Sequence, residues 1–228
     1  DASANMLTAI RQLPTSSMLM EDGSAIPYTD GNTFLADINL DGHLDVIVMT
    51  VNQSSRIVYL YVWDVETETI ICTKKLPNTR KFGIPQIGDS DGDNIPEICF
   101  IAGTYGGHST GLNDLIYALK PSVTSTPPTF NIMWTTPHSD NSGATGLTLF
   151  DFNQDGYSEL VYRDVNNLRI INGSLHNHLT GETLSTPYDL ASITCPSSTG
   201  IEYPVIADID GDGGAEIVVG GNAIPSDD

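Results

Sequence analysis

Short runs of alternating hydrophobic and polar residues, separated by Gly, Pro, Asp, Asn and Ser, divide the chain along most of its length. The clearest run covers 56–63. In a strand, alternate residues point to opposite faces, so one face would carry Ile57, Tyr59 and Tyr61 and the other Val58, Leu60 and Val62. No stretch has a convincing helical period. The pattern therefore predicts an all-β protein.

The predicted strands fall into groups of four, each expected to form an antiparallel unit. The first group is 33–36, 44–51, 56–63 and 69–76. The second is 84–87, 97–102, 115–119 and 130–135, and the third is 147–150, 159–162, 168–171 and a poorly defined strand within 181–190. Segments rich in Ser, Thr, Pro and Gly, such as 121–128 and 136–146, are expected to be surface loops.

One acidic sequence follows the first strand of each group and occurs four times in the chain. Its copies are DINLDGHLD from Asp37 (loop 1), DSDGDNIPE from Asp89 (loop 2), DFNQDGYSE from Asp151 (loop 3) and DIDGDGGAE from Asp208 (loop 4). The first aspartates are 52, 62 and 57 residues apart, a spacing typical of repeat units that build propellers or arrays. We therefore expect about four copies of one structural unit.

Oxygen-bearing side chains occupy the first, third, fifth and ninth positions of every loop. They are Asp37, Asn39, Asp41 and Asp45 in loop 1, Asp89, Asp91, Asp93 and Glu97 in loop 2, Asp151, Asn153, Asp155 and Glu159 in loop 3, and Asp208, Asp210, Asp212 and Glu216 in loop 4. The start of each loop is typical of an EF-hand. An EF-hand, however, closes with a bidentate Glu at the twelfth position and turns into a helix, whereas here the closing acid is ninth and a β-branched run follows.

Calcium is the ligand that this arrangement favours. Hard divalent cations take six to eight oxygen ligands, and three or four converging carboxylates would repel one another without an ion. The four loops hold 14 of the 29 acidic residues, and four Ca²⁺ ions, with eight positive charges, would change the formal charge from −20 to −12. The two other interpretations are acidic turns without a metal, and ions that stabilise the fold without marking an active site.

These loops resemble the FG-GAP or VCBS type of β-propeller repeat, over about residues 33–220. The resemblance implies four-stranded blades in which each loop joins the first two strands and binds one calcium ion through the side chains named above. It also implies that the seventh residue contributes its backbone carbonyl: His43, Ile95, Tyr157 and Gly214. The integrin-like Phe-Gly and Gly-Ala-Pro signatures are mostly absent, so the form found in secreted bacterial surface proteins is the closer relative. Asn94 stands where the other loops have Gly, and we expect it to adopt a positive φ.

The implied blades divide the chain into blade 1 at 33–80, blade 2 at 81–138, blade 3 at 139–196 and a partial blade 4 at 197–228. Residues 1–32 would supply outer strands of a neighbouring or closing blade, because MLTAIRQLP at 6–14 resembles the predicted strand IICTKKLP at 70–77. Either the N-terminal strand completes the last blade, or the chain is part of a larger propeller or surface protein. The second is favoured, since four blades would be few for this family.

Composition narrows the classes of partner. A formal charge of −20 argues against nucleic acids and anionic membrane surfaces. No apolar run approaches the ~20 residues of a spanning helix, and the N-terminus lacks the features of a signal peptide, as expected for the processed chain of a secreted or cell-surface protein. Cys72, Cys99 and Cys195 are too few and too scattered for a disulfide framework or a zinc site, and allow at most one disulfide.

Catalytic candidates are few. His108 and the pair His176 and His178 lie in sequences that could line a cleft, but no Ser-His-Asp or Cys-His signature surrounds them. The function that the sequence favours is a non-catalytic, calcium-stabilised module for interaction or scaffolding, which contacts a protein or glycan surface through variable loops.

The alternative function is a polysaccharide-degrading, lyase-like propeller enzyme. With only nine basic residues, the chain would hold an acidic polysaccharide poorly unless calcium bridged the two. The variable loops expected to contact a partner are 104–113, 121–129 and 174–181.

Overall fold

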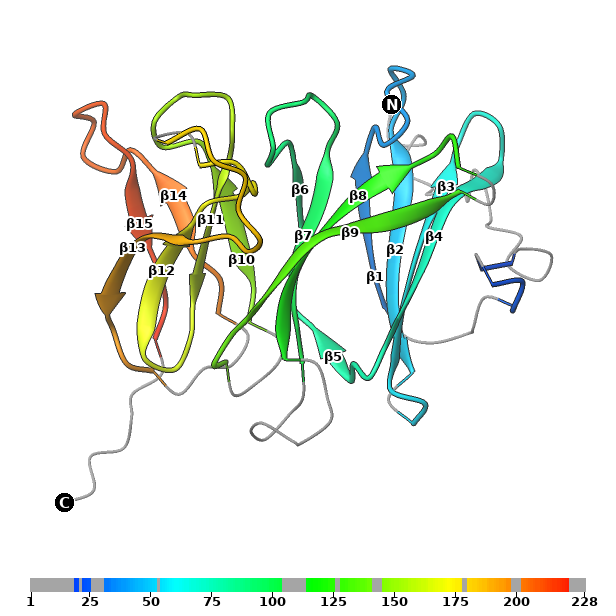
Figure 1. The fold of residues 1–228 in the computed structure, drawn as a ribbon, viewed down its shortest axis with the longest axis horizontal. Helices are drawn as coiled ribbons and strands as arrows, with labels where there is room; N and C mark the ends of the chain where they lie inside the picture. The colour runs from blue at the N-terminus through cyan, green and yellow to red at the C-terminus, as the bar shows by residue number, and fades with distance from the viewer. Residues whose placement is uncertain are drawn as a thin grey trace, which may run out of the picture.

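The computed structural model describes residues 19–20, 22–25, 31–52, 54–103, 114–125, 128–140, 145–177, 180–197 and 202–221. These residues form fifteen β-strands and no helix, so the all-β prediction is confirmed (Figure 1). Within the same residues, no helix is long and apolar enough to cross a membrane.

The largest sheet has nine strands and contains two antiparallel groups. The first group is β1 (Gly31–Ala36), β2 (Asp45–Asn52), β3 (Ile57–Asp64) and β4 (Thr69–Pro77), paired in chain order. The second is β6 (Gln86–Gly88), β7 (Glu97–Gly103), β8 (Leu115–Ser122) and β9 (Thr129–Pro137), and the short strand β5 (Lys81–Phe82) also pairs with β7.

Two further sheets follow along the chain. A four-stranded antiparallel sheet contains β10 (Leu147–Phe150), β11 (Glu159–Arg163), β12 (Asn167–Ile171) and β13 (Asp189–Thr194) in that order. The last sheet is the hairpin of β14 (Val205–Ala207) and β15 (Glu216–Val218). The predicted strands of the first three groups therefore lie close to their expected positions, with one exception.

That exception is the fourth strand of the third group, which the sequence places within 181–190 and the structure places at β13, Asp189–Thr194. All six residues of β13 are exposed, so the strand lacks the alternation of apolar and polar residues that would reveal it. It is held by pairing with β12, across an irregularity between Ile170 and Ile171.

The sequence predicts a separate four-stranded unit for each of the first two groups, but the structure joins these two groups in one sheet. A parallel pairing of Thr73 with Thr129 joins β4 to β9, and the Thr129 hydroxyl donates a hydrogen bond to the Thr73 carbonyl at 3.1 Å. Figure 1 shows β8 and β9 slanting across the molecule toward β3 and β4. Such a contact between residues far apart in the chain leaves no local pattern in the sequence.

Two hydrophobic clusters fill the space between consecutive groups of strands. The first connects β2, β3 and β4 to β7, β8 and β9, with Ile47, Leu60, Phe100, Leu119 and Phe130 among its members. The second connects β7, β8 and β9 to β10, β11 and β12, with Ile101, Trp134, Leu147, Leu160 and Ile171 among its members. The middle group is therefore buried on both faces, and the three groups are stacked face to face.

The outer face of the first group carries a third cluster. Tyr59, Tyr61 and Trp63 of β3 pack there with Met20, whereas Val58, Leu60 and Val62 face the first cluster. The alternation predicted for 56–63 is thus confirmed. The segment 22–25 is connected to this group by an ion pair of 2.6 Å between Asp22 and Lys75, while the predicted N-terminal strand at 6–14 lies outside the described residues.

Candidate metal-binding loops

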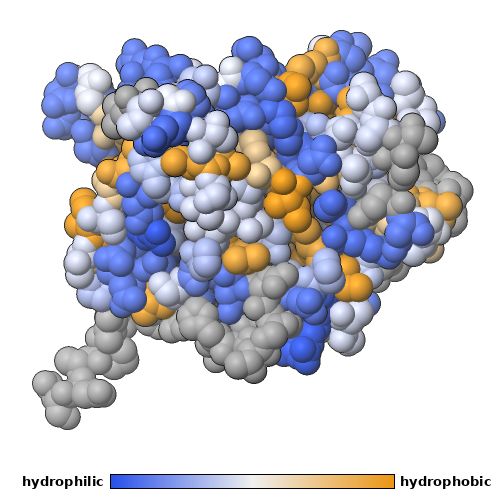
Figure 2. Space-filling view, viewed as in Figure 1, coloured by the Kyte–Doolittle hydropathy of each residue, from blue (hydrophilic) through white to orange (hydrophobic). Residues whose placement is uncertain are grey.

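Each of the four acidic loops connects the two strands of an antiparallel hairpin. The hairpins are β1–β2, β6–β7, β10–β11 and β14–β15, and their loops lie at the same end of the molecule, the upper end in Figure 1. Figure 2 shows mostly hydrophilic residues along this edge. In every hairpin the closing acid is the first residue of the second strand and pairs with the last residue of the first: Ala36 with Asp45, Gly88 with Glu97, Phe150 with Glu159 and Ala207 with Glu216.

The first-position aspartate folds each loop around its own carboxylate. Asp37 accepts hydrogen bonds from the backbone N–H groups of Asp41 (3.1 Å) and Gly42 (2.8 Å). Asp89, Asp151 and Asp208 accept equivalent bonds from the fourth to sixth residues of their loops. Because one side chain satisfies several backbone donors, the loop conformation depends on this aspartate.

The fifth and seventh positions are also connected in every loop. The carboxylate at the fifth position accepts the backbone N–H of the seventh residue, at 2.7–3.0 Å: His43 to Asp41, Ile95 to Asp93, Tyr157 to Asp155 and Gly214 to Asp212. These bonds use the backbone N–H of the seventh residue and so do not depend on its side chain.

The closing acid is the buried member of the set. Asp45 is 1% exposed, Glu97 0% and Glu159 3%, and each accepts the backbone N–H of the second loop residue. Burial is the main cause that raises the pKa of all three carboxyls above the ordinary value. Glu216 makes the same bond, to Ile209, but is partly exposed.

Two positions in each loop adopt a left-handed backbone. The sixth residues have φ of 90° at Gly42, 66° at Asn94, 88° at Gly156 and 91° at Gly213, so the prediction for Asn94 is confirmed. The fourth residues do the same, although two of them are not glycine: Leu40 has φ 60° and Gln154 has φ 57°. This second left-handed position was not predicted, because loops 1 and 3 have ordinary side chains there and only loops 2 and 4 have glycine.

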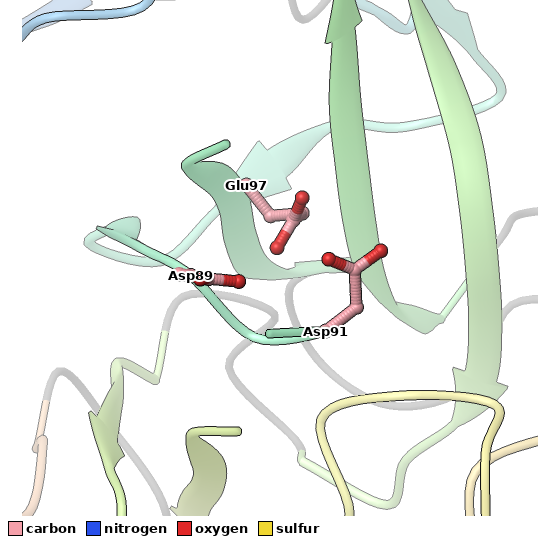
Figure 3. A group of neighbouring side chains, drawn as sticks. All are labelled: Asp89, Asp91 and Glu97. Carbon is pink, nitrogen blue, oxygen red and sulfur yellow. The ribbon is translucent and has the colours of Figure 1, made fainter. Parts of the chain in front are cut away.

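Carboxylates converge most closely in loops 2 and 4. In the described residues, Asp89, Asp91 and Glu97 each offer an oxygen within 4.8 Å of the others, and so do Asp208, Asp210 and Glu216. Figure 3 shows the first set, in which Glu97 at the start of β7 points toward the two loop aspartates. Asp91 Oδ1 and Glu97 Oε1 are buried and have no hydrogen-bond partner among the described residues.

Loops 1 and 3 bring their acids together less closely. Both have asparagine at the third position, and its amide nitrogen donates to the fifth-position carboxylate: Asn39 to Asp41 at 3.0 Å, and Asn153 to Asp155 at 2.9 Å. An amide thus occupies the third position in loops 1 and 3, where loops 2 and 4 have a carboxylate.

Lys120 of β8 contacts loop 2, and the sequence analysis did not single it out. Its Nζ lies 2.6 Å from Asp91 Oδ2, 2.6 Å from Asp93 Oδ2 and 3.4 Å from Glu97 Oε1. Burial alone would lower the pKa of Lys120, but the bonds to Asp91 and Asp93 outweigh it and raise the pKa. A lysine within an apolar strand was the available signal, but its position against loop 2 follows only from the pairing of β7 with β8.

The histidines that the structure describes have separate environments. The ring of His138 is buried, with Nε2 3.0 Å from the Ala102 carbonyl and Nδ1 accepting the N–H of Asp140, which is a structural role. His43 is exposed on loop 1, and His176 is exposed and paired with Thr183 in an isolated bridge. His108 and His178 lie outside the described residues.

The cysteines are free thiols: Cys72 and Cys99 are buried, and Cys195 is partly exposed. Burial raises the pKa of the Cys99 thiol, so it is expected to be unreactive. Trp63 and Trp134 are buried packing residues.

No family model matches the chain, and no curated protein matches its sequence. One solved structure with a related shape is described as the structural basis of specific recognition of non-reducing terminal N-acetylglucosamine by an Agrocybe aegerita lectin. The two chains share 10% sequence identity and superpose with a TM-score of 0.37, over 86% of this chain and 62% of that one. This chain therefore spans less than two thirds of the length of the lectin, and a likeness at this level carries no argument about fold or ligand.

Proposed function

We propose that this chain is a calcium-stabilised β-propeller module of the FG-GAP or VCBS type, which acts by presenting loops to a partner. The observation that carries the proposal is the fourfold hairpin loop. The closing acid has the same strand register in all four copies. In three of them it is almost completely buried. Burying a charged carboxyl group three times without a divalent cation nearby would cost stability each time.

The donor set fits a hard divalent cation. Every side chain at the first, third, fifth and ninth positions offers oxygen, and none of these offers sulfur or imidazole nitrogen, which favours calcium over zinc or copper. In loop 2 the buried oxygens Asp91 Oδ1 and Glu97 Oε1 lack a hydrogen-bond partner among the described residues, as expected of atoms that bind a metal ion. The first, third, fifth and ninth residues of each loop would hold the ion, and the seventh carbonyl would complete the set.

The packing supports a propeller. Three groups of four strands stack face to face, and the first strands of successive groups, β6, β10 and β14, lie next to one another. We propose blades at 33–80, 81–138 and 139–196 and a partial blade at 197–228. The parallel contact of Thr73 with Thr129 is then a contact between the outer strands of blades 1 and 2.

The calcium proposal is tested by equilibrium dialysis of the chain against calcium. Up to four ions per chain are expected, and magnesium at the same concentration should bind more weakly, because it keeps its water ligands. Asp155→Asn should remove one bound ion. Asp189→Asn is the matched control, since Asp189 pairs with Arg169 outside the loops and should leave the number unchanged. A folded chain that binds no calcium at millimolar concentration contradicts the proposal.

The interaction role is a separate part of the proposal. The loops share one scaffold geometry, whereas the segments between strands, including 121–129 and 174–181, differ in length and sequence from one group to the next. A protein or glycan surface outside the cell is the proposed partner. Incubation with polygalacturonate and with alginate tests the lyase alternative. We expect no unsaturated oligosaccharide to be released, and release that is lost in His176→Ala would favour the enzyme.

A further inference from the structure

One residue at the end of the third strand, or directly after it, lies opposite the closing acid in the first three groups. Continuing the register of the paired strands by one residue places Asp64 opposite Asp45, Lys120 opposite Glu97 and Asn172 opposite Glu159. An acid, a base and an amide thus occupy the same place beside three otherwise similar loops. Their contacts decide what each does to its loop.

Asp64 and Asn172 do not compete for the space within their loops. Asp64 is buried, accepts the backbone N–H groups of Glu66 and Thr67 and lies 3.4 Å from the Asn39 amide nitrogen, so it adds a carboxylate beside loop 1. Asn172 donates to the carbonyl oxygen of His176 at 2.9 Å and is thus directed toward the segment that follows β12.

Lys120 reaches the point where the acids of loop 2 converge. It contacts three carboxylates at 2.6, 2.6 and 3.4 Å, and two of these, Asp91 and Glu97, belong to the set whose oxygens lie within 4.8 Å of one another. An ammonium group has three N–H donors and one charge. It cannot form hydrogen bonds to all the oxygens of the four loop 2 carboxylates. Among the described residues, Asp91 Oδ1 has no hydrogen-bond partner, and Glu97 Oε1 has only the 3.4 Å ion pair with Lys120 itself.

We propose that Lys120 is an internal counter-cation of loop 2, which competes with a divalent cation for the same carboxylates. This inference rests on the proposed calcium-binding function and adds a regulation to it. A metal ion in loop 2 has to displace the lysine ammonium from Asp91 and Asp93, whereas loops 1, 3 and 4 have no lysine among their described contacts. Loop 2 is therefore the weakest of the four sites and the one that depends least on calcium for its stability.

The variant Lys120→Met keeps the apolar stem of the side chain and removes the charge. In EDTA it should melt at a lower temperature than the wild type, because three carboxylates lose their cation. In equilibrium dialysis, loop 2 of Lys120→Met should bind calcium on the order of tenfold more tightly than loop 2 of the wild type. Lys75→Met is the matched control for the affinity, since Lys75 pairs with Asp22 on the outer face, away from loop 2, and its loss should leave every calcium affinity unchanged.

The double variant Lys120→Met/Asp91→Asn assigns the gain to loop 2. Asp91 contacts Lys120 through its side chain, so its loss should abolish the tighter site without removing the hydrogen bonds that Asp89 makes to the loop backbone. If the wild type binds calcium and Lys120→Met changes neither its affinities nor the melting temperature in EDTA, the inference is wrong and the proposed function stands. If no variant binds calcium, both are wrong.

Discussion

Ser158 donates its backbone N–H to the carbonyl oxygen of Asp89 at 3.4 Å, and this bond connects loop 3 to loop 2. The two loops belong to different sheets, yet they approach so closely that the ring of Tyr157 lies against the backbone of Gly92. Gly173 completes the contact, since its Cα faces the carbonyl oxygens of both Ser158 and Ser90. Loops 2 and 3 are thus joined by a main-chain hydrogen bond, and a side chain at position 173 would press on the backbone of both.

Gly173→Ala is therefore expected to destabilise the protein by about 1–3 kcal/mol, the usual cost of overpacking. The added Cβ would lie 2.0 Å from the Ser158 carbonyl oxygen and 2.9 Å from that of Ser90, and backbone atoms cannot move aside cheaply. Urea unfolding followed by tryptophan fluorescence measures the effect, because the Trp134 ring donates to the Gly173 carbonyl. Gly220→Ala is the control, since its nearest neighbour would be 4.0 Å away. Equal stabilities of the two variants would contradict the proposed contact.

Leu40→Gly is expected to stabilise the chain by up to about 1 kcal/mol, although it removes a hydrophobic side chain. Leu40 is 54% exposed and has φ 60°, a conformation that glycine adopts without strain. Leu44 lies in the same loop and is 57% exposed, but it is not among the left-handed residues. Leu44→Gly should therefore destabilise by about 0.5–1 kcal/mol. Thermal melts of both variants decide the matter, and a loss of stability in Leu40→Gly would show that its side chain packs more than its exposure indicates.

The hairpin loops could be predicted from the sequence because their information is local. The nine-residue pattern fixes which residue closes the loop, and the β-branched residues after Asp45 fix the strand that follows. Lys120 could not be found in this way, because its contact with Asp91 depends on the pairing of strands 29 residues apart.

Buried polar residues outside the motif were missed for the same reason. Asp140 lies in a segment that the sequence assigns to a surface loop, yet it is 2% exposed and accepts the N–H of Thr145. Arg163 ends an apolar strand and would be expected to face water, but it is buried. In both cases the partners are backbone groups of distant or irregular segments, which no periodicity reveals.

Arg163→Met is expected to destabilise the protein by about 2 kcal/mol, because it leaves backbone carbonyls without a donor. The Arg163 guanidinium donates to the carbonyl of Gly220 at 2.7 Å and to those of Cys195 and Pro196 at 3.0 Å. It thus connects β11 to the segments that follow β13 and β15. Hydrogen exchange should therefore accelerate in β14 and β15 more than in β2 and β3.

Two further variants control the Arg163 experiment. Arg163→Lys should recover only part of the stability, because one ammonium cannot reach three carbonyls in the planar geometry of a guanidinium. Arg56→Met changes an exposed arginine and should have little effect. Unchanged exchange in β14 and β15 of Arg163→Met would contradict the proposed connection.

Glu159→Gln should change the stability in opposite directions with and without calcium. Burial raises the pKa of the Glu159 carboxyl above its ordinary value of 4.5, so the folded chain binds this proton more tightly than the unfolded chain does. The charged form therefore costs stability at pH 7 in EDTA, and the amide variant should be more stable there, by on the order of 1 kcal/mol. In saturating calcium the variant lacks a ligand and should be less stable, by about 2.7 kcal/mol where calcium is 100-fold above its dissociation constant.

The pH dependence gives the same test a second measurement. In EDTA, the free energy of unfolding of the wild type should rise as the pH falls from 7 toward about 4.5, because Asp45, Glu97 and Glu159 take up protons in the folded state first. The pKa of Asp41 is lowered, chiefly by the backbone N–H of His43. Asp41 therefore reduces the free energy of unfolding only when the pH falls below about 3.8, its ordinary pKa. Glu159→Gln should show a smaller rise, and the exposed control Glu66→Gln should match the wild type. A variant that is destabilised equally in EDTA and in calcium would show that Glu159 has only a structural role.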